Sequence, residues 1–436
     1  MILLSIFKRD FLKLASNYYQ SQDYNKALKY ALKAINSDTD NIDKIMLLGN
    51  ICYVLQDYEK AQDYYCKILL LDSHNIGAQI NYADTLIMLH RYSQAEQYLP
   101  NIADEKTKLF LQAKISFAQE DFVSAEEYFI AYTKLKNTDA WAWNMLSQSA
   151  QKNGHFQLAL EAGITAVEKS AGDDSHHLNL AYTIYEIAVE KGKEFVLPIL
   201  QKWYAEYPDN PIVKHSWNCF FPSLDFCKSD SLYVKKIFDE FADSFDETLQ
   251  DLDYTVPLNI SQIAKANMQD SVLKKISILD LGCGTGLCAQ NLKKIFNKAK
   301  FFGVDISPKM LAKAQNKNIY KKLINDDIES YLFEQKNKHE LIVAADVLTY
   351  FGDLKTLFQG MYKSLKENGK IIFSVSALSE EDLNWQQHLS GRFLHSKKYI
   401  KKILIETGFC SIKFASCMLR KEGEKNVFGW IVYAVK

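Results

Sequence analysis

The sequence has few of the residues that mark disordered, fibrous or disulfide-bonded proteins. Its 436 residues include 7 Pro and 17 Gly, and 48% are hydrophobic, a composition typical of globular domains. The 8 Cys are scattered without a C-x-x-C pair, which argues against a disulfide framework and against a zinc site. We therefore expect no metal site, and a reducing cytoplasm is the expected location.

Long apolar runs and one-sided charge are also lacking. The apolar stretch over residues 1–7 ends at Lys8, far short of the roughly 18 residues that a membrane span needs, and it has neither the cationic leader nor the cleavage site of a signal peptide. The net charge is -1, and no dense basic patch with interleaved aromatic residues occurs. Neither a membrane span nor nucleic-acid binding is expected.

What the first half does contain is an internal repeat. An aromatic residue is followed three positions later by Ala, and the aromatic positions are 34, 34, 30 and 34 residues apart. Another small residue lies twelve positions before each Ala, so two antiparallel helices can approach closely, and such pairs must stack to bury their apolar faces. The triplets of small, aromatic and Ala positions are Ala15/Tyr24/Ala27, Gly49/Tyr58/Ala61, Ala83/Tyr92/Ala95, Ala113/Phe122/Ala125 and Ser147/Phe156/Ala159.

This pattern resembles the tetratricopeptide repeat over roughly residues 10–170, although Thr39, Ser73 and Asn137 replace the usual Pro between units. A degraded sixth unit over 177–207 and a capping helix over 211–221 would complete an α-solenoid at residues 8–221. The resemblance implies a concave groove that binds a protein or peptide. The array could instead hold the second domain or form a homo-oligomer, and the oligomeric state is left open.

After a linker at residues 222–230, strands alternate with helices, a pattern that predicts a largely parallel, doubly wound sheet and an α/β fold overall. The expected strands are 277–281, 300–304, 322–325, 341–345, 370–376, 411–416 and 427–435. The expected helices are 287–296, 308–315, 354–366 and 397–407.

The end of the first expected strand carries a glycine-rich turn. Asp280 is followed by Gly282, Cys283, Gly284 and Gly286, and a helix begins directly afterwards. Glycines permit a tight turn and close approach of a ligand, while the helix start offers free N–H groups. A dinucleotide fingerprint would need its third glycine at position 287, which is Leu. The G-x-G-x-G spacing after an acid indicates S-adenosylmethionine instead.

Acids also follow the next three expected strands. Asp305 and Ile306 end the second strand, where a carboxylate can hold a ribose diol, and Asp327 with Ile328 follows the third, where an acid can accept from an adenine amine. Asp346 ends the fourth, on the rim where a methyl donor meets its acceptor. Because ligands of such sheets bind at the carboxyl ends of the strands, these acids are expected to share one site.

Residues 231–436 resemble the class I S-adenosylmethionine-dependent methyltransferases, and more narrowly the group that carries tetratricopeptide repeats before that domain. Phe238-Asp239-x-x-Ala242-x-x-Phe245-Asp246, Ala345-Asp346-Val347-Leu348-x-Tyr350-x-Gly352-Asp353-Leu354 and Gly391-Arg392-Phe393-x-His395-Ser396-x-x-Tyr399 carry the narrower match. The resemblance implies a Rossmann-like, doubly wound, seven-stranded domain that ends in an antiparallel hairpin around Gly423.

The resemblance also assigns roles to residues. It places the methionine moiety on the loop of Gly282, Cys283, Gly284 and Gly286, the ribose on Asp305 beside Ile306, and the adenine on Asp327 and Ile328. Asp280 would orient the loop or meet the donor's amino group. Residues 231–255, aromatic between Tyr233 and Phe245, would form a lid, or would be a plain packing helix.

Methyl transfer from a sulfonium depends on alignment and proximity, and a base is needed only if the acceptor arrives protonated. The candidates on the acceptor side are His395, Tyr350 and Asp346, with Arg392 and Tyr399 facing the substrate. The sequence lacks the N/D-P-P-Y/F tetrapeptide and the Pro-Cys dipeptide, which disfavours adenine-N6, glutamine and cytosine-carbon acceptors.

Three functions remain open: a methyltransferase whose repeats recruit a protein as substrate or regulator, a small-molecule O- or N-methyltransferase whose repeats serve assembly only, and a donor-binding scaffold without turnover.

Overall fold

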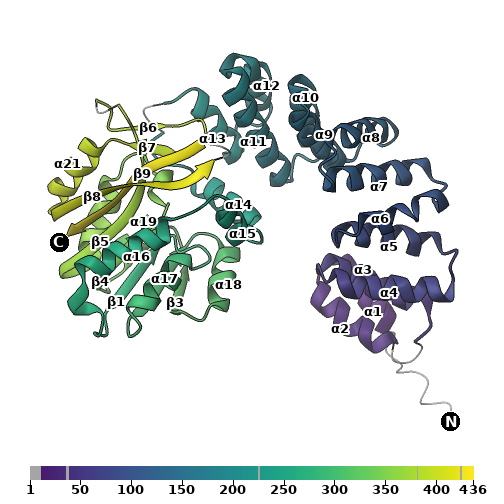
Figure 1. Ribbon diagram of the computed structural model, residues 1–436, viewed down its shortest axis with the longest axis horizontal. Coiled ribbons are helices and arrows are strands. Elements are labelled where there is room, and N and C mark those ends of the chain that lie inside the picture. The colour runs from purple at the N-terminus through teal and green to yellow at the C-terminus, as the bar shows by residue number, and fades with distance from the viewer. Residues whose placement is uncertain (1–10, 36–38, 224–225, 381, 423–424) are drawn as a thin grey trace, which may run out of the picture. The chain divides into compact units, whose positions relative to one another are not determined.

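The computed structural model describes residues 11–35, 39–223, 226–380, 382–422 and 425–436 (Figure 1). Residues 8–10, where the array is expected to begin, and Gly423 of the expected hairpin lie outside the described residues. The chain divides into two compact units, Met1–Thr183 and Ile184–Lys436. The division falls inside helix α11 (Asp174–Lys191), before two helices that the sequence assigns to the array.

The first unit consists of paired helices, as the repeat pattern predicts. The α1 to α5 bounds are Phe11–Gln20, Tyr24–Ile35, Ile42–Val54, Tyr58–Leu71 and Ile76–Met88. The bounds of α6, the 3-10 helix η1, and α7 to α10 are Tyr92–Glu96, Leu99–Asn101, Glu105–Ala118, Phe122–Leu135, Ala140–Lys152 and Phe156–Lys169. Each aromatic position of the repeat therefore begins the second helix of a pair.

The small residues of the repeat lie where paired helices meet. Ala83, Ala95, Ala113 and Ala125 are fully buried. In the fifth pair, Ser147 Oγ donates a hydrogen bond to the backbone oxygen of Ala159 at 2.7 Å, a contact that a large side chain would prevent. Close approach of the helices is thus the physical reason for the small positions.

The third pair is the irregular one. Its second helix, α6, has five residues, and Pro100 lies in the 3-10 helix that follows. Proline has no amide hydrogen and cannot continue a helical ladder. The early end of α6 accounts for the step of 30 residues, instead of 34, between Tyr92 and Phe122.

The second unit begins with helices and continues as a mixed sheet. Its α12 to α16 run over Lys193–Glu206, Pro211–Phe220, Ser231–Phe241, Phe245–Asp251 and Val256–Asn267, and η2 over Gln269–Ser271. The helices α17 to α21 and the 3-10 helix η3 run over Leu287–Ile295, Pro308–Asn316, Ile328–Glu334, Lys355–Ser364, Lys397–Thr407 and Leu348–Tyr350.

The sheet of the described residues has nine strands. They are β1 to β9 at Ser277–Leu281, Lys300–Asp305, Tyr320–Asn325, His339–Ala344, Leu365–Ala377, Trp385–Gln387, Phe393–His395, Cys410–Glu422 and Lys425–Val435. The order is β3-β2-β1-β4-β5-β7-β6, β9 pairs with both β5 and β8, and β1 to β5 are parallel. The strands β8 and β9 are antiparallel. The expected fold class is confirmed, and two three-residue strands, β6 and β7, extend the expected seven.

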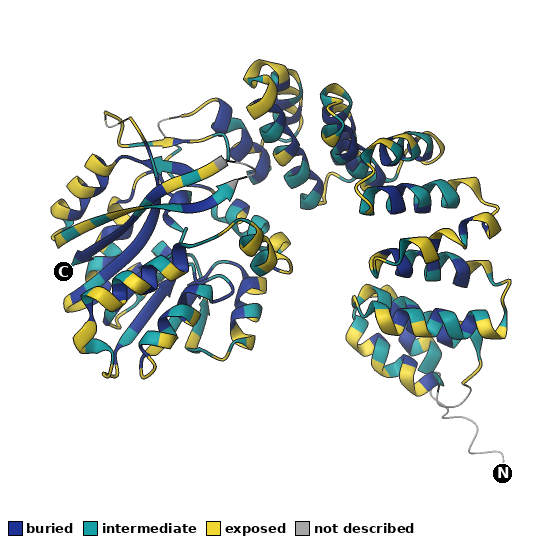
Figure 2. Cartoon of the chain, in the orientation of Figure 1, coloured by how far each residue is buried: buried dark blue, intermediate teal, exposed yellow. Residues whose placement is uncertain are grey.

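Helices cover both faces of this sheet, so the central strands are buried on both sides, as parallel strands require (Figure 2). One cluster joins Leu279 and Leu281 of β1 to the buried faces of α19, α20 and α21. The other joins Ile278 of the same strand to α16 and α17. The side chains of β1 therefore alternate between the two clusters, which fix the strand on both faces. The loop after the strand lies beyond both clusters and is available to form a site. No helix among the described residues is long and apolar enough to cross a membrane.

Candidate active site

The glycine loop leads from β1 into α17. Gly282, Gly284 and Gly286 have φ of +59°, +52° and +92°, in the left-handed region that glycine adopts without strain. A Cβ at Gly282 would also overlap the side chain of Val347. Gly286 is the N-cap of α17. Two separate requirements, backbone conformation and lack of space, therefore fix glycine at the first of these positions.

Asp305 ties the end of β2 to this loop. Its carboxylate accepts hydrogen bonds from the backbone N of Gly284 at 2.7 Å and of Ser307 at 2.9 Å. Burial raises the pKa of Asp305 to about 6, although these hydrogen bonds act against the rise. The same carboxylate holds the loop in place and lines the cavity beside it.

Asp280 lies behind the loop, outside the cavity lining. The hydroxyl of Tyr320 donates to its carboxylate at 2.7 Å, and the other oxygen, Oδ1, is buried without a hydrogen-bond partner among the described residues. Burial raises the pKa of this carboxyl to about 7. Asp280 thus acts on the loop from its rear side.

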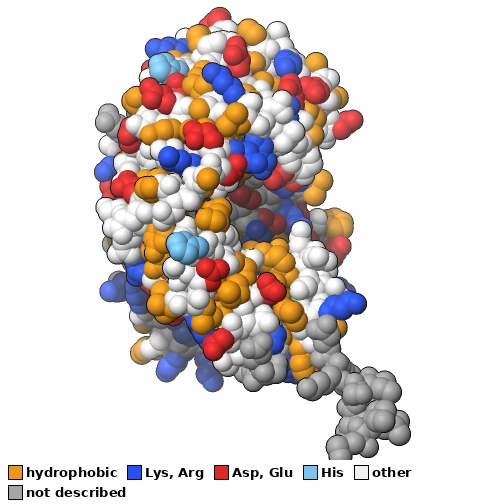
Figure 3. All heavy atoms as spheres, turned by 90° about the vertical axis from the view of Figure 1, so that its right-hand side faces the viewer, with side chains coloured by type: hydrophobic (Ala, Val, Ile, Leu, Met, Phe, Trp, Pro, Cys, Tyr) orange, Lys and Arg blue, Asp and Glu red, His pale blue; other side chains and the backbone are white. Residues whose placement is uncertain are grey.

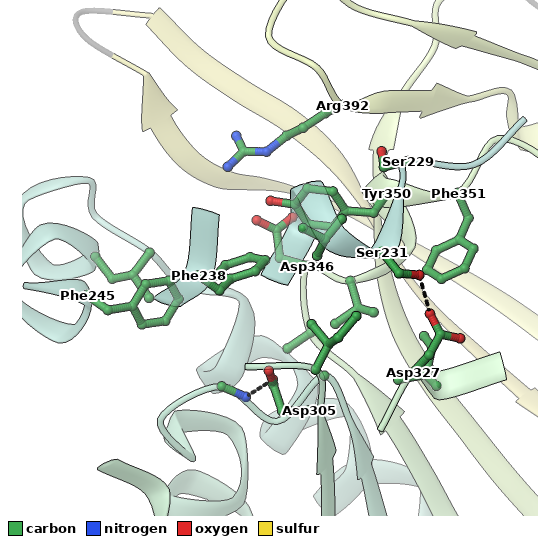
Figure 4. Close-up of a pocket in the computed structure, with 18 of the residues that line it drawn as sticks. Ser229, Ser231, Phe238, Phe245, Asp305, Asp327, Asp346, Tyr350, Phe351 and Arg392 are labelled. Atoms are coloured by element: carbon green, nitrogen blue, oxygen red, sulfur yellow. Dashed lines mark hydrogen bonds between the residues drawn. The ribbon is translucent and has the colours of Figure 1, made fainter. Parts of the chain in front are cut away.

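One cavity adjoins the strand ends β1 to β4 and encloses about 960 Å³ of empty space, its open mouth included. Nine of the predicted site residues lie in the lining of this cavity: Gly282, Gly284, Asp305, Ile306, Asp327, Ile328, Asp346, Tyr350 and Arg392. Cys283, Gly286, Asp280 and His395 are not among the lining residues. Figure 4 shows Asp305 and Arg392 entering from opposite sides.

Asp327 occupies one end of the cavity and is bound by residues at and just before the start of α14. Ser231 Oγ donates to its carboxylate at 2.8 Å and Lys228 Nζ lies 3.2 Å away, while Lys228 also reaches Glu329 at 2.7 Å (Figure 4). Burial raises the pKa of Asp327, but the hydrogen bonds from Ser231 and Lys228 outweigh it and lower the pKa overall. Sequence reasoning missed Lys228 because it treated residues 222–230 as a linker, and it placed Ser231 in the expected lid without a contact to Asp327.

Asp346 lies at the other end and forms a buried ion pair. Arg420 Nη1 lies 3.1 and 3.0 Å from the two carboxylate oxygens of Asp346. The backbone of Asp346 has a φ of +57°, and its N donates a hydrogen bond to Ser374 Oγ at 2.7 Å. Arg420 is only 2% exposed. The sequence analysis missed this arginine, which comes from β8, 74 positions along the chain, because nothing in the sequence around it distinguishes it from the other charged residues of that strand.

His395 lies outside the cavity. Its side chain is fully buried, Nε2 donates to the backbone oxygen of Gly352 at 3.2 Å, and burial lowers its pKa to about 4. Tyr399 is likewise turned to Asp353, to which its hydroxyl donates at 2.9 Å. The geometry brings Tyr350 and Arg392 to the cavity, but it does not bring His395 or Tyr399 there.

The expected lid segment lies against the cavity. Phe238 of α14 and Phe245 of α15 line it, and the Phe238 ring centroid is 5.6 Å from that of Tyr350. Ser307 Oγ donates to Asp239 at 2.6 Å, and Lys317 Nζ lies 2.8 Å from Asp246. These polar contacts anchor the segment beside the glycine loop while its rings face inward.

The residues present fit S-adenosylmethionine. Gly284 borders open space, with Phe245 3.8 Å from where its Cβ would stand, so the loop forms a cradle that a side chain would fill. Asp305 offers a carboxylate beside the cradle, Ile306 and Ile328 offer apolar faces, and the lid rings can contact a cation through their π faces. Among the described residues, no three His, Cys, Asp or Glu side chains gather as a metal site would require.

Two family models match the chain. Residues 278–369 match a methyltransferase domain, and residues 20–102 match the family of subunit 3 of the anaphase-promoting complex, or cyclosome. The chain therefore joins a tetratricopeptide-like repeat array to an S-adenosylmethionine-dependent methyltransferase domain, and the expectation of S-adenosylmethionine as its cofactor is confirmed.

Relatives with assigned functions match the second half. Malonyl-[acyl-carrier protein] O-methyltransferase of Priestia megaterium is 36% identical over 104 residues, which are 23% of this chain and 37% of that protein. Phosphoethanolamine N-methyltransferase 2 of Caenorhabditis elegans is 28% identical over 146 residues, 31% of this chain and 33% of that protein. The chain spans only about a third of either relative.

Solved structures also align with part of the chain. Magnesium protoporphyrin IX methyltransferase from Synechocystis PCC 6803 with bound SAH aligns with 47% of this chain and 99% of that one, at 18% identity and a TM-score of 0.38. The type IV pilus biogenesis factor PilW aligns with 47% of this chain and 95% of that one, at 18% identity and a TM-score of 0.40.

Proposed function

We propose that this protein transfers the methyl group of S-adenosylmethionine to an acceptor bound between Asp346, Tyr350 and Arg392, and that its repeats recruit a protein as substrate or regulator. The observation that carries the proposal is the cavity in which the glycine loop, Asp305 and Asp327 share walls with a second group of polar side chains. One part of the cavity suits the donor, and the other is left for an acceptor.

When bound, S-adenosylmethionine supplies a methyl group on a positively charged sulfur with a neutral leaving group. The role of the chain is to hold the two reactants in line, because orientation and proximity can supply most of the rate. Gly282 and Gly284 allow close approach of the donor, and Asp305 orients it. Phe238 and Phe245 exclude water. Asp280, buried behind the loop, positions it and touches no reactant.

The recruiting role of the repeats rests on their surface. On the face seen in Figure 3, acidic, basic and hydrophobic side chains are interspersed. Leu70, Val123 and Leu135 of this unit are 82%, 63% and 58% exposed, and stacked repeats present extended surfaces to partners. A small-molecule O- or N-methyltransferase is the second candidate, favoured by the relatives named above, one of which acts on an acyl group carried by a protein.

The cytoplasm is the proposed location, since all eight cysteines lie in the described residues and are free thiols. Extracellular domains usually pair their cysteines in disulfide bonds.

Donor binding is tested with Asp305→Ala. Loss of the carboxylate removes the partner of a ribose diol and of the Gly284 amide, so the affinity for S-adenosylhomocysteine is expected to fall by about 1 to 3 kcal/mol. Calorimetry on the full chain measures it. Asp326→Ala, whose side chain is outside this cavity, is the matched control. Unchanged affinity in Asp305→Ala would contradict the assignment.

Methyl transfer is then tested by incubating the full chain with methyl-labelled donor and cell extract. Label in a protein band that disappears when residues 1–173 are removed supports recruitment through the repeats. Label in the metabolite fraction supports the small-molecule reaction. Donor binding without any transfer would support a donor-binding scaffold without turnover.

A further inference from the structure

The lid segment carries two aspartates to which the proposed function gives no role. Asp239 lies on α14 and Asp246 on α15, and the lid rings Phe238 and Phe245 come directly before them. Because successive side chains of a helix point in different directions, the rings can face the cavity while the carboxylates face the protein around it. Both carboxylates contact residues that hold the glycine loop in place.

Asp239 reaches the glycine loop through Ser307. Ser307 Oγ donates a hydrogen bond to Asp239 at 2.6 Å, and the backbone N of Ser307 donates to Asp305 at 2.9 Å. The other carboxylate oxygen of Asp305 accepts from the backbone N of Gly284 at 2.7 Å (Figure 4). Ser307 and Asp305 are buried, so water has little access to these bonds. A continuous chain of hydrogen bonds therefore leads from α14 to the loop.

Asp246 contacts the glycine loop directly. Thr285 lies within the loop, and its Oγ1 donates to Asp246 Oδ1 at 2.5 Å. Lys317 Nζ, at the end of α18, lies 2.8 Å from Asp246 Oδ2. Thr285 is 2% exposed and is not among the described residues that line the cavity. Asp246 therefore acts on the loop from outside the cavity, through a side chain that does not face the ligand.

Asp243 lies between these two aspartates and offers an internal comparison. Its carboxylate is 2.7 Å from Lys313 Nζ of α18, and the two side chains are 68% and 42% exposed. No hydrogen bond among the described residues joins Asp243 to the glycine loop, and neither partner lines the cavity. Exposed ion pairs of this kind contribute little to stability. Asp243 thus links the lid segment to the same helix without a connection to the donor site.

We propose, on the basis of the donor binding proposed above, that Asp239 and Asp246 are positioning residues for S-adenosylmethionine. They act through Ser307 and Thr285 and hold the glycine loop in the conformation that accepts the donor. Glycine has more accessible backbone conformations than any other residue, and the apparent affinity for a ligand falls with the fraction of molecules in the competent conformation. Contacts that fix the loop before the donor arrives raise that fraction. The lid segment is then part of the donor site as well as its cover.

Binding of S-adenosylhomocysteine to the full chain, measured by calorimetry, tests this assignment. Loss of a hydrogen bond to a charged group corresponds to roughly a tenfold change in an equilibrium constant, so Asp239→Ala and Asp246→Ala should each weaken binding about tenfold. Asp243→Ala is the matched control on the same segment and should change the affinity about twofold at most. Equal losses in all three variants would overturn the proposal, because the segment would then be only a cover anchored by its charges. Unchanged affinity in Asp239→Ala or Asp246→Ala would overturn the role of that residue.

A double-mutant cycle tests whether Asp246 acts through Thr285. Thr285→Val removes the hydroxyl group and keeps the shape of the side chain, whereas Thr285→Ser keeps the hydroxyl group. We expect Thr285→Val to weaken S-adenosylhomocysteine about as much as Asp246→Ala, the double variant to bind no more weakly than either, and Thr285→Ser to bind like the wild type. Losses that multiply in the double variant would contradict the proposed connection.

Thermal unfolding without ligand separates positioning from a general loss of stability. Asp246→Ala is expected to unfold at about the temperature of Asp243→Ala and still to bind S-adenosylhomocysteine more weakly. If affinity instead falls in step with Tm across the variants, the two aspartates only stabilise the fold and the proposal is wrong. Failure of the wild type to bind S-adenosylhomocysteine would overturn the proposed function itself.

Discussion

At the scale of single residues, two aspartates on adjacent strands of the same sheet have different roles. Asp280 and Asp305 end or nearly end adjacent parallel strands, yet Asp305 faces the cavity and accepts two backbone N–H groups. Asp280 is directed to Tyr320, with one oxygen left without a hydrogen-bond partner among the described residues. Partners, rather than position in a motif, decide which acid meets a ligand.

Asp280 should make stability depend on pH. Its pKa is about 7 in the fold and near 3.9 in an unfolded chain, so between these values the folded state binds more protons and the free energy of unfolding falls as pH rises, by up to roughly 1.4 kcal/mol per pH unit. Asp280→Asn keeps an acceptor for Tyr320 without the charge. The Tm of the wild type should therefore fall more than that of the variant between pH 4.5 and 8, in the absence of donor.

Calorimetric Tm profiles of both proteins measure this difference, and titration of Asp305 cancels because both retain it. Parallel profiles would show that Asp280 does not titrate in this range.

The sequence pointed to cavity residues that lie near strand ends, and it missed those that reach the cavity from distant elements. The glycine loop, Asp305 and Asp327 lie within a few positions of a strand end, where the α/β topology places ligands. Arg420 and Tyr254 reach the cavity only because β8 lies across the sheet from Asp346 and the start of α16 binds that strand, Thr255 N donating to Leu419 O at 3.2 Å. The sequence around Arg420 and Tyr254 does not indicate these contacts between distant elements.

At the scale of elements, the turn between β6 and β7 is held by α13. The rings of His215 from α13 and Tyr233 from α14 stack with centroids 3.7 Å apart, and Gly391 of the turn lies against His215 with φ of +83°. A Cβ at Gly391 would be 2.5 Å from His215 Nε2. The helix therefore determines where the next residue, Arg392, enters the cavity.

Gly391→Ala should accordingly destabilise the protein and weaken the acceptor site together. The left-handed backbone alone costs roughly 1 to 2 kcal/mol for a residue with a Cβ, and the overlap with His215 adds to it, so a loss of about 1 to 3 kcal/mol is expected. Thermal unfolding measures the first effect, and methyl transfer from labelled donor measures the second. Gly172→Ala is the control, since nothing lies within 4 Å of its Cβ. A variant as stable as the control would contradict the packing.

Periodicity predicted the long elements and missed the short ones. The strand Ser277–Leu281 and the helix Lys397–Thr407 have the expected bounds, because the first is a short, mostly apolar run and the second has apolar residues at helical spacing. The strands β6 and β7 have three residues each and too few alternations for a pattern to appear. They form because β5 offers a free edge at Ser376 and Ala377, a feature of the sheet rather than of the local sequence.

At the scale of the whole molecule, repeat spacing predicts the array, but it cannot say where the array ends. The sequence analysis assigns α12 to a degraded sixth unit over residues 177–207 and α13 to a capping helix of the array. In the structure both helices belong to the unit Ile184–Lys436. The reason is tertiary: α13 buries Ile212, Val213 and His215, its Cys219 accepts from Gln387 Nε2 at 3.4 Å, and it packs on α14 through the His215 and Tyr233 rings.

This assignment predicts which truncated fragments of the chain fold stably. A fragment of residues 173–436 keeps α11 whole, together with the hydrogen bond from Ser175 N to Asp173, and it should fold and bind S-adenosylhomocysteine with the affinity of the full chain. A fragment of residues 222–436 follows the sequence boundary but removes His215, whose ring stacks on Tyr233. Loss of a buried aromatic contact costs about 3 to 5 kcal/mol, so the shorter fragment should unfold at a markedly lower temperature and expose Arg392 and its turn. Calorimetry of both fragments, with and without S-adenosylhomocysteine, measures the difference. Equal stability of the two would show that α13 is an appendage of the array, and that the methyltransferase domain begins where spacing alone would place it.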